Sequence, residues 1–223
     1  IRKYLNKNKS DYLFITAPEN IAWLLNIRGH DNPNSPIPNC QLIINNKKSF
    51  YLISSKDKVS KLINEKKIKS DQVVEPKNFN KFISNLKGKK IIVDKNTCSI
   101  FFENILKKKF KILSIVDPIY SLKSLKNKTE IKNMLNAHIF DGVALTKFIY
   151  WIKNINKKTI TEFDAQNKLE SFRKKNKEYL YPSFNTIAGA GGNGAIVHYR
   201  ATKINTKKIN KKDIFLCDSG GQY

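Results

Sequence analysis

The sequence is poor in cysteine and contains no long apolar run. Its three cysteines, Cys40, Cys98 and Cys217, are far apart and form no CxxC pair, which excludes a disulfide framework and indicates reduced thiols in a cytoplasmic protein. No stretch of about eighteen apolar residues occurs, so we expect no membrane-spanning helix and no membrane partner. The first residues lack an apolar segment with a small-residue cleavage site, and we therefore expect no secretory signal.

Acidic residues and arginine are also scarce. The chain has 42 Lys and Arg against 18 Asp and Glu, a net charge of +24, which raises the hypothesis of nucleic-acid binding. Arginine makes the bidentate contacts typical of phosphate and base recognition, yet it occurs only at positions 2, 28, 173 and 200. The lysines are spread over expected loops and helix faces. This pattern favours a solvated basic surface over a nucleic-acid site.

The first half of the chain alternates between strand and helix patterns. We predict strands at 11–17, 40–45, 49–54, 72–75 and 89–94, the second and third being joined as a hairpin across residues 46–48. We predict helices at 18–26, 57–65, 78–86 and 98–108. This alternation predicts an α/β domain over residues 1–117, since Pro118 interrupts any regular element.

The second half begins with two helices. Asn127 and Glu130 have the spacing of a capping box and predict the start of a long helix over 128–153. Its apolar residues recur at helical spacing, so we expect one buried face made of Ile131, Leu135, Leu145, Ile149 and Ile152. A second helix is predicted over about 162–175, with caps and a buried side provided by Thr161, Asp164, Ala165, Leu169 and Phe172.

Strand patterns follow these helices. The segments 183–189, 195–200 and 213–220 read as strands, and a Lys/Asn-rich turn separates the last two. Two helices followed by antiparallel strands predict an α+β arrangement over residues 123–223. Because the chain stops directly after a strand, we expect this domain to be incomplete, with an uncovered sheet edge.

The glycine-rich stretch GAGGNG at 189–194 has the GxGxxG spacing of dinucleotide-binding loops, and Asp213 lies about twenty residues downstream. Such a loop requires a helix directly after the glycines, because the N–H groups at the helix N-terminus bind the pyrophosphate. The following AIVHYR at 195–200 alternates like a strand, and the Lys-Ser/Thr pair of a P-loop is absent. The sequence therefore favours a turn in which several glycines adopt positive φ.

His198 and Asp218 are the candidate functional residues. If 195–200 is a strand, His198 shares a face with Ile196 and points inward or into a cleft. Asp218 ends the apolar run IFLCD, where a carboxylate requires a metal, a cation or N–H donors. The residue types alone leave a metal ligand and a structural turn residue equally open for Asp218. Cys217 alternates to the opposite face and is interpreted as core packing.

Several motifs occur in the order found in one enzyme family. The segment SFNTIAGAGGNGAIVHYR, a basic turn and DIFLCDSGGQY together resemble the aminopeptidase P branch of the pita-bread (creatinase-like, M24) metallopeptidases. Upstream, ENIAWLLNIRGHDNPNSPI is similar to the domain that precedes the catalytic one, and SLKSLKNKTEIKNMLNAHIFDGVAL to the start of the catalytic domain. The resemblance implies a creatinase-like α/β N-terminal domain followed by the first part of an α+β pita-bread domain.

The resemblance also implies a function. Members of this branch are Xaa-Pro aminopeptidases, hydrolases that remove an N-terminal residue preceding proline from peptide substrates, by a hydroxide activated at two divalent metal ions, usually Mn²⁺. Of the family's five metal ligands only the first has a counterpart here, at Asp218, and the others are expected beyond Tyr223. His198 corresponds to a histidine that contacts the substrate and assists proton movement near the scissile bond. We expect the chain to be inactive alone.

The remaining polar candidates are expected to be structural. His30 is interpreted as an exposed loop residue, and His138 as a packing or helix-contact residue of the long helix. Arg28 and Asp31 resemble a family loop that approaches the active site of a neighbouring domain or subunit, but a structural role is favoured for both.

Two other functions remain open. One is a pita-bread module that has lost its metal ligands and binds peptides or basic protein tails, which the retained Asp218 and His198 oppose. The other is a basic nucleic-acid-binding protein, which the charge pattern opposes. The resemblance further implies a cytoplasmic protein that is a homodimer when intact, and the charge pattern predicts no nucleic-acid partner.

Overall fold

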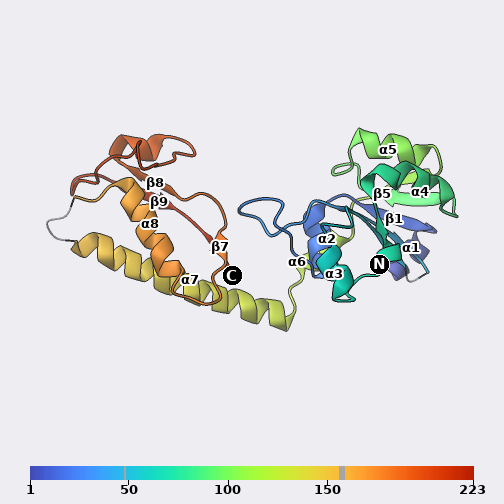
Figure 1. Ribbon diagram of the computed structural model, residues 1–223, viewed down its shortest axis with the longest axis horizontal. Helices are drawn as coiled ribbons and strands as arrows, with labels where there is room; N and C mark the ends of the chain where they lie inside the picture. The colour runs from blue at the N-terminus through green and yellow to red at the C-terminus, as the bar shows by residue number, and fades with distance from the viewer. Residues whose placement is uncertain (48, 156–158) are drawn as a thin grey trace. The chain divides into compact units, whose positions relative to one another are not determined.

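The structure is a computed structural model that describes residues 1–47, 49–155 and 159–223. The chain divides into two compact units (Figure 1). Unit 1 consists of Ile1–Asn32 and Pro36–Leu125, and unit 2 consists of Pro33–Ser35 and Lys126–Tyr223. Each has its own hydrophobic core, so the two are described separately.

The described part of unit 1 contains a six-stranded mixed sheet with the strand order β4-β3-β2-β1-β5-β6. Its strands are β1 (Tyr12–Ile15), β2 (Gln41–Asn45), β3 (Phe50–Ile53), β4 (Val73–Val74), β5 (Lys90–Val93) and β6 (Lys111–Ser114). The central strand β1 pairs antiparallel with β2 and parallel with β5, which places Phe14 between Ile43 and Val93. The β2–β3 pair is antiparallel, whereas β3–β4 and β5–β6 are parallel.

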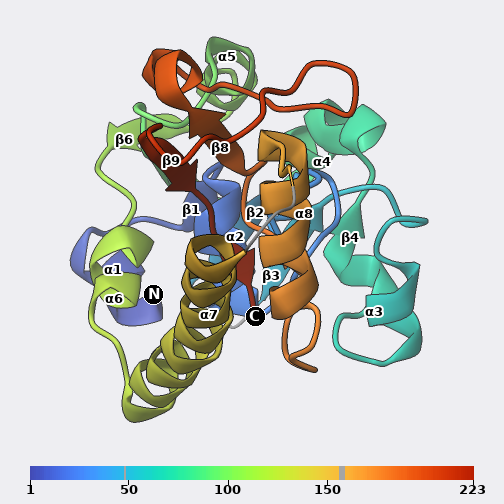
Figure 2. The same ribbon diagram turned by 90° about the vertical axis from the view of Figure 1, so that its left-hand side faces the viewer.

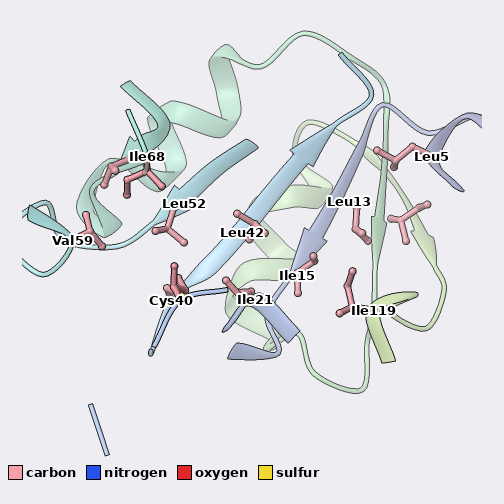
Figure 3. Packing of buried hydrophobic residues seen from close by; sticks show 13 residues of the cluster. Leu5, Leu13, Ile15, Ile21, Cys40, Leu42, Leu52, Val59, Ile68 and Ile119 are labelled. Carbon is pink, nitrogen blue, oxygen red and sulfur yellow. The ribbon is translucent and has the colours of Figure 1, made fainter. Parts of the chain in front are cut away.

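Helices cover both faces of this sheet. One side carries α1 (Arg2–Lys7), α2 (Pro18–Leu25), α3 (Ser60–Asn64) and α6 (Ile119–Ser124), and the other carries α4 (Phe79–Asn85) and α5 (Ile100–Lys107). Two short 3₁₀ turns, η1 (Ser70–Gln72) and η2 (Pro76–Asn78), flank β4. Because side chains alternate along a strand, Leu13 and Ile15 enter the first core, shown in Figure 3, while Phe14 enters the second. The α/β prediction for this half is therefore confirmed.

Most α-helices and strands of unit 1 match the predicted ones, and among the described residues three such elements are additional. The additional elements are α1, β6 and α6. Each of them offers few apolar residues: α1 buries only Leu5, and β6 has two half-buried residues between exposed ends. Such short elements carry too little periodicity to be detected from sequence. The predicted hairpin connection over 46–48 includes Lys48, which lies outside the described residues.

Unit 2 begins with the two predicted helices, α7 (Lys128–Asn154) and α8 (Glu162–Arg173), which lie side by side (Figures 1 and 2). Both start as their caps predict. The Asn127 side chain accepts from the Thr129 and Glu130 N–H groups, and Glu130 accepts from the Asn127 N–H at 2.8 Å. Thr161 and Asp164 form the corresponding capping box of α8.

Short antiparallel strands complete unit 2. The strand β8 (Ile187–Ala190) pairs with β9 (Phe215–Asp218), and β7 (Tyr181–Pro182) pairs with β10 (Gly221–Gln222). The core lies between the helices and β9, and its members are Phe148, Trp151, Ile152, Ala165, Leu169, Phe172, Ile209, Phe215 and Cys217. The packing role predicted for Cys217 agrees with this cluster. No helix among the described residues combines the length and apolar character needed to span a bilayer.

The buried face predicted for α7 is wrong for four of its five residues. Ile131, Leu135, Leu145 and Ile149 are 37–61% exposed, and only Ile152 packs against the core of unit 2. The buried residues of α7 are instead Ala144 and Phe148. Helical spacing marks an apolar stripe but does not show what covers it. Among the described residues, the core of unit 2 reaches α7 only near Phe148.

Candidate functional site

The segment after the glycines is not a strand, and this corrects the prediction for 195–200. Gly191–Ala195 form a 3₁₀ turn, η3, followed by a further turn in which the Tyr199 N–H donates to the Ile196 carbonyl at 3.2 Å. His198 adopts a left-handed backbone with φ of 55°. The neighbour of β9 is therefore β8 rather than 195–200. Since no α-helix follows the glycines either, the requirement for a dinucleotide loop is not met.

At two positions of this loop the backbone requires glycine. A Cβ on Gly189 would lie 2.8 Å from the Gly194 nitrogen and 2.9 Å from backbone atoms of Asn193, because η3 folds back onto β8. Gly191 has φ of +57°, a conformation that side chains disfavour. By contrast, a Cβ on Gly192 would meet nothing within 4 Å. The GxGxxG spacing thus reflects a tightly folded turn above the β8–β9 pair (Figure 1).

Replacement of Gly189 by alanine should lower the free energy of unfolding of unit 2 by about 2–3 kcal/mol, because the obstructing atoms are backbone and cannot rotate away. Gly192→Ala is the matched control and should change it by less than about 0.5 kcal/mol. Urea denaturation of both variants tests this. Equal effects at the two positions would contradict the close approach of η3 to β8.

A buried carboxylate, Glu162, accepts hydrogen bonds from several residues of the loop 190–199. It is the first residue of α8 and is 0% exposed. Its Oε1 accepts from the Ala190 N–H at 2.7 Å and from the Asn193 amide at 3.0 Å. Its Oε2 accepts from the Tyr199 hydroxyl at 2.7 Å and from the Lys207 N–H at 2.8 Å. The position of Glu162 directly after the Thr161 cap is the one sequence signal for this residue, and it does not by itself predict the contacts with the loop.

The protonation states of this cluster follow from its geometry. Burial alone would raise the pKa of Glu162, but the four donors outweigh it and hold the pKa below its usual range. Burial and the bond to Glu162 raise the pKa of Tyr199 to about 12, so its hydroxyl remains a donor. Since the folded pKa of Glu162 lies below the ordinary value of 4.5, the cluster stabilises the fold above that pH and loses its effect as the pH falls through the folded pKa.

His198 is exposed on this loop rather than pointing inward, which corrects the orientation expected from a strand. Within the described residues, its imidazole makes no hydrogen bond to another group. The adjacent Tyr199 is buried and bonded to Glu162. His198 therefore sits at the rim of a fixed turn, with both ring nitrogens available to a ligand.

Asp218 ends β9, as predicted, and lies opposite Ile187 of β8. Its side chain is exposed, and the part of the chain that the structure describes gives it neither a hydrogen bond nor an ion pair. Structural turn carboxylates normally accept N–H bonds, as Asp213 does from Asn210 at 3.1 Å. A free carboxylate at the end of a strand suits a hard cation. The Asp218 carboxylate is therefore suited to be one ligand of a metal ion. The described residues contain no group of three or more His, Cys, Asp or Glu side chains that could hold an ion by themselves.

An ion pair fixes the turn that follows Asp218. The guanidinium of Arg173, 1% exposed, donates to both carboxylate oxygens of Asp141 at 2.6 and 3.1 Å. It also donates to the Ser219 hydroxyl at 3.1 Å, and the Tyr223 hydroxyl donates to Asp141 at 2.7 Å. This contact set joins α7, α8 and the residue after Asp218. The scarcity of arginine, which occurs at four positions in the chain, is the one sequence signal for Arg173, and it does not predict these partners.

The other candidate residues are accounted for by local contacts. Arg28 donates to the Ile27 carbonyl at 2.9 Å, and Asp31 forms an ion pair of 2.7 Å with Lys58 while accepting from the Asn39 N–H. His30 is exposed. His138 is also exposed, and its Nδ1 bonds the Met134 carbonyl at 2.8 Å within α7. These contacts agree with the structural roles favoured for Arg28 and Asp31. For His138 they support the contact within the helix and not the packing role, because its side chain is exposed.

Comparison with known protein families identifies both halves of the chain. Residues 1–130 match the creatinase/prolidase N-terminal domain, and residues 132–223 match metallopeptidase family M24. The chain belongs to the creatinase/prolidase family. The resemblance drawn from the sequence motifs is therefore confirmed, as is the fold class of a creatinase-like domain followed by pita-bread elements.

Curated relatives agree with this assignment. The chain is 34% identical over 231 residues to the Xaa-Pro aminopeptidase ApepP of Drosophila melanogaster, covering 100% of this chain and 37% of that protein. It is 34% identical over 250 residues to a probable Xaa-Pro aminopeptidase P of Paracoccidioides brasiliensis, covering 39% of that protein. The chain thus spans less than half of the length of the curated relatives it matches.

Solved structures show the same fold. The X-prolyl aminopeptidase of Caenorhabditis elegans, described as a cytosolic enzyme with a di-nuclear active site, aligns over 100% of this chain and 38% of its own with a TM-score of 0.86 and 23% identity. The prolidase of Pyrococcus furiosus aligns over 100% of this chain and 61% of its own with a TM-score of 0.69 and 24% identity. At these identities the likeness shows the fold alone.

Proposed function

We propose that this chain is part of a metallo-aminopeptidase that hydrolyses the peptide bond between an N-terminal residue and a following proline. One observation carries the proposal: within a unit that matches metallopeptidase family M24, Asp218 presents an exposed carboxylate without a described partner at the end of β9. The relatives named Xaa-Pro aminopeptidase supply the substrate class. Being peptidases, they give no support to a ligand-free binding module or a nucleic-acid-binding protein.

The residues of this chain would have distinct roles in the reaction. Asp218 would hold one of two divalent metal ions, with manganese proposed because hard carboxylate oxygens suit it. When bound, such ions supply Lewis-acid polarisation and water activation. His198 would bind the carbonyl oxygen of the scissile bond through a ring N–H and hold a proton there. The Arg173–Asp141 pair, through Ser219, would keep the Asp218 carboxylate in place.

Removal of metal from the intact protein should abolish this activity. Dialysis against a chelator should reduce turnover of an Xaa-Pro peptide to background, and added Mn²⁺ should restore it, whereas an Xaa-Ala peptide should remain uncleaved throughout. Peptide cleavage followed by chromatography measures both. Chelator-resistant turnover, or equal turnover of the two peptides, would contradict the proposal.

Residues 1–223 by themselves should show no turnover, because a single candidate carboxylate does not hold two ions. Cleavage of an Xaa-Pro peptide by this segment in the presence of Mn²⁺ would contradict that expectation. A cytoplasmic location and a homodimeric assembly of the intact protein belong to the same proposal. The free cysteines and the cytosolic worm enzyme support the location.

A further inference from the structure

The two ends of the loop that carries His198 are tied to the same buried carboxylate. We propose that Glu162 is a positioning residue for His198, acting through Tyr199 and Asn193, in the reaction proposed above and on which this inference rests. Glu162 does not face a substrate, since it is 0% exposed beneath the loop. Its effect would be exerted on the position of the histidine.

The hydrogen bonds of Glu162 are distributed along the whole loop. Oε1 accepts at the start, from the N–H of Ala190, where β8 ends. Asn193, within η3, donates its amide both to this carboxylate and to the Tyr199 hydroxyl at 3.0 Å. Oε2 accepts at the far end, from the Tyr199 hydroxyl. A single side chain thus closes a ten-residue turn, 190–199, over the β8–β9 pair.

These contacts require a carboxylate in particular. Four donors converge on the two oxygens of Glu162. An ionised carboxylate can accept hydrogen bonds at both oxygens, whereas a protonated carboxyl or an amide carries a hydrogen-bond donor at one of the two positions. Glu162 forms no ion pair with a described residue. The nearby Lys207 donates its backbone N–H to the carboxylate, whereas its ammonium donates to the Ala190 carbonyl at 3.4 Å. The negative charge of Glu162 is therefore stabilised by N–H and O–H dipoles and not by a cation. A glutamine of the same shape would turn an NH₂ group toward two of the donors.

The consequence for His198 follows from its backbone. A left-handed φ of 55° is less favourable for histidine than for glycine, so contacts with neighbouring residues are needed to maintain it at His198. The following residue, Tyr199, is the one that Glu162 holds. Release of Tyr199 would let the backbone at 198 relax and the exposed imidazole move away from the scissile bond.

Three variants of the intact protein test this inference: Glu162→Gln, Tyr199→Phe and, as a matched charge control on the exposed surface of unit 2, Glu178→Gln. Amide hydrogen exchange of the segment 187–202, measured by mass spectrometry, should accelerate roughly ten- to hundredfold in Glu162→Gln relative to the helix α7, and about threefold in Tyr199→Phe. Glu178→Gln should leave it unchanged. Unchanged exchange in Glu162→Gln would overturn the anchoring role.

A double-mutant cycle separates positioning from general destabilisation. Glu162→Gln should lower kcat roughly tenfold, with KM changed by less than about threefold, in the wild-type background, and should have almost no further effect in a His198→Ala background. An equal loss of kcat in both backgrounds would overturn the inference. If Glu162→Gln does not fold, Tyr199→Phe takes its place in the cycle. If the wild-type protein has no peptidase activity, the proposed function is refuted. The hydrogen-exchange measurement would still show whether Glu162 anchors the loop.

Discussion

Asp218→Asn in the intact protein should lower kcat/KM for an Xaa-Pro peptide on the order of a thousandfold, equivalent to about 4 kcal/mol of transition-state stabilisation. The substitution keeps the shape of the side chain but removes its charge, so it weakens any cation bound there. It should leave the free energy of unfolding within about 0.5 kcal/mol of wild type, because the carboxylate is exposed and has no described partner. Steady-state kinetics and urea denaturation measure the two effects.

The metal content of the same variant distinguishes ligand loss from other causes. After dialysis, Asp218→Asn should retain less Mn²⁺ than wild type, as measured by elemental analysis. Glu178→Gln removes an exposed carboxylate elsewhere in unit 2 and should retain wild-type metal and activity. Full metal content together with wild-type kcat/KM in Asp218→Asn would show that this carboxylate is not a ligand.

The helices of unit 2 could be predicted from the sequence because their ends are encoded locally. The capping boxes at Asn127 and Thr161 are each completed by a residue three positions later, and both form as expected. The strands β1, β2, β3 and β5 could also be predicted, since each is a continuous apolar run bounded by polar residues. These signals need no knowledge of distant contacts.

The loop around His198 could not be predicted in the same way. Residues 195–200 have strand-like composition, yet Ala190, Asn193 and Tyr199 are bound by Glu162, which lies 28 to 37 positions earlier. A tertiary hydrogen-bond set of this kind overrides local β-propensity. The histidine was identified from a motif, whereas its exposed position and left-handed backbone depend on contacts that no local pattern contains.

Asp141→Asn should destabilise unit 2 by about 3 kcal/mol or more, the largest stability effect we expect in this chain. It leaves the guanidinium of Arg173, 1% exposed, without a countercharge. Arg173→Met should cost less, about 1–3 kcal/mol, because the remaining carboxylate is 28% exposed and can be hydrated. Asp141→Asn should cost more than Arg173→Met because it leaves the more deeply buried charge, that of Arg173, without a partner. Lys174→Met, beside Arg173 but in a surface pair, should cost at most about 1 kcal/mol.

Tryptophan fluorescence can report this effect for unit 2 alone. In a Trp23→Phe background the remaining tryptophan is Trp151, which packs against the core of unit 2.

The stability that the Asp141–Arg173 pair provides should depend on pH. Bonds from Arg173 and Tyr223 outweigh burial and hold the pKa of Asp141 below its ordinary 3.8, so the stabilisation is present above that pH and is lost as the pH falls through the folded pKa. The difference between wild type and Asp141→Asn in urea denaturation should therefore be large at pH 7 and shrink in strong acid. A difference that stays constant with pH, or a larger loss in Arg173→Met than in Asp141→Asn, would show that charge burial is not what the pair provides.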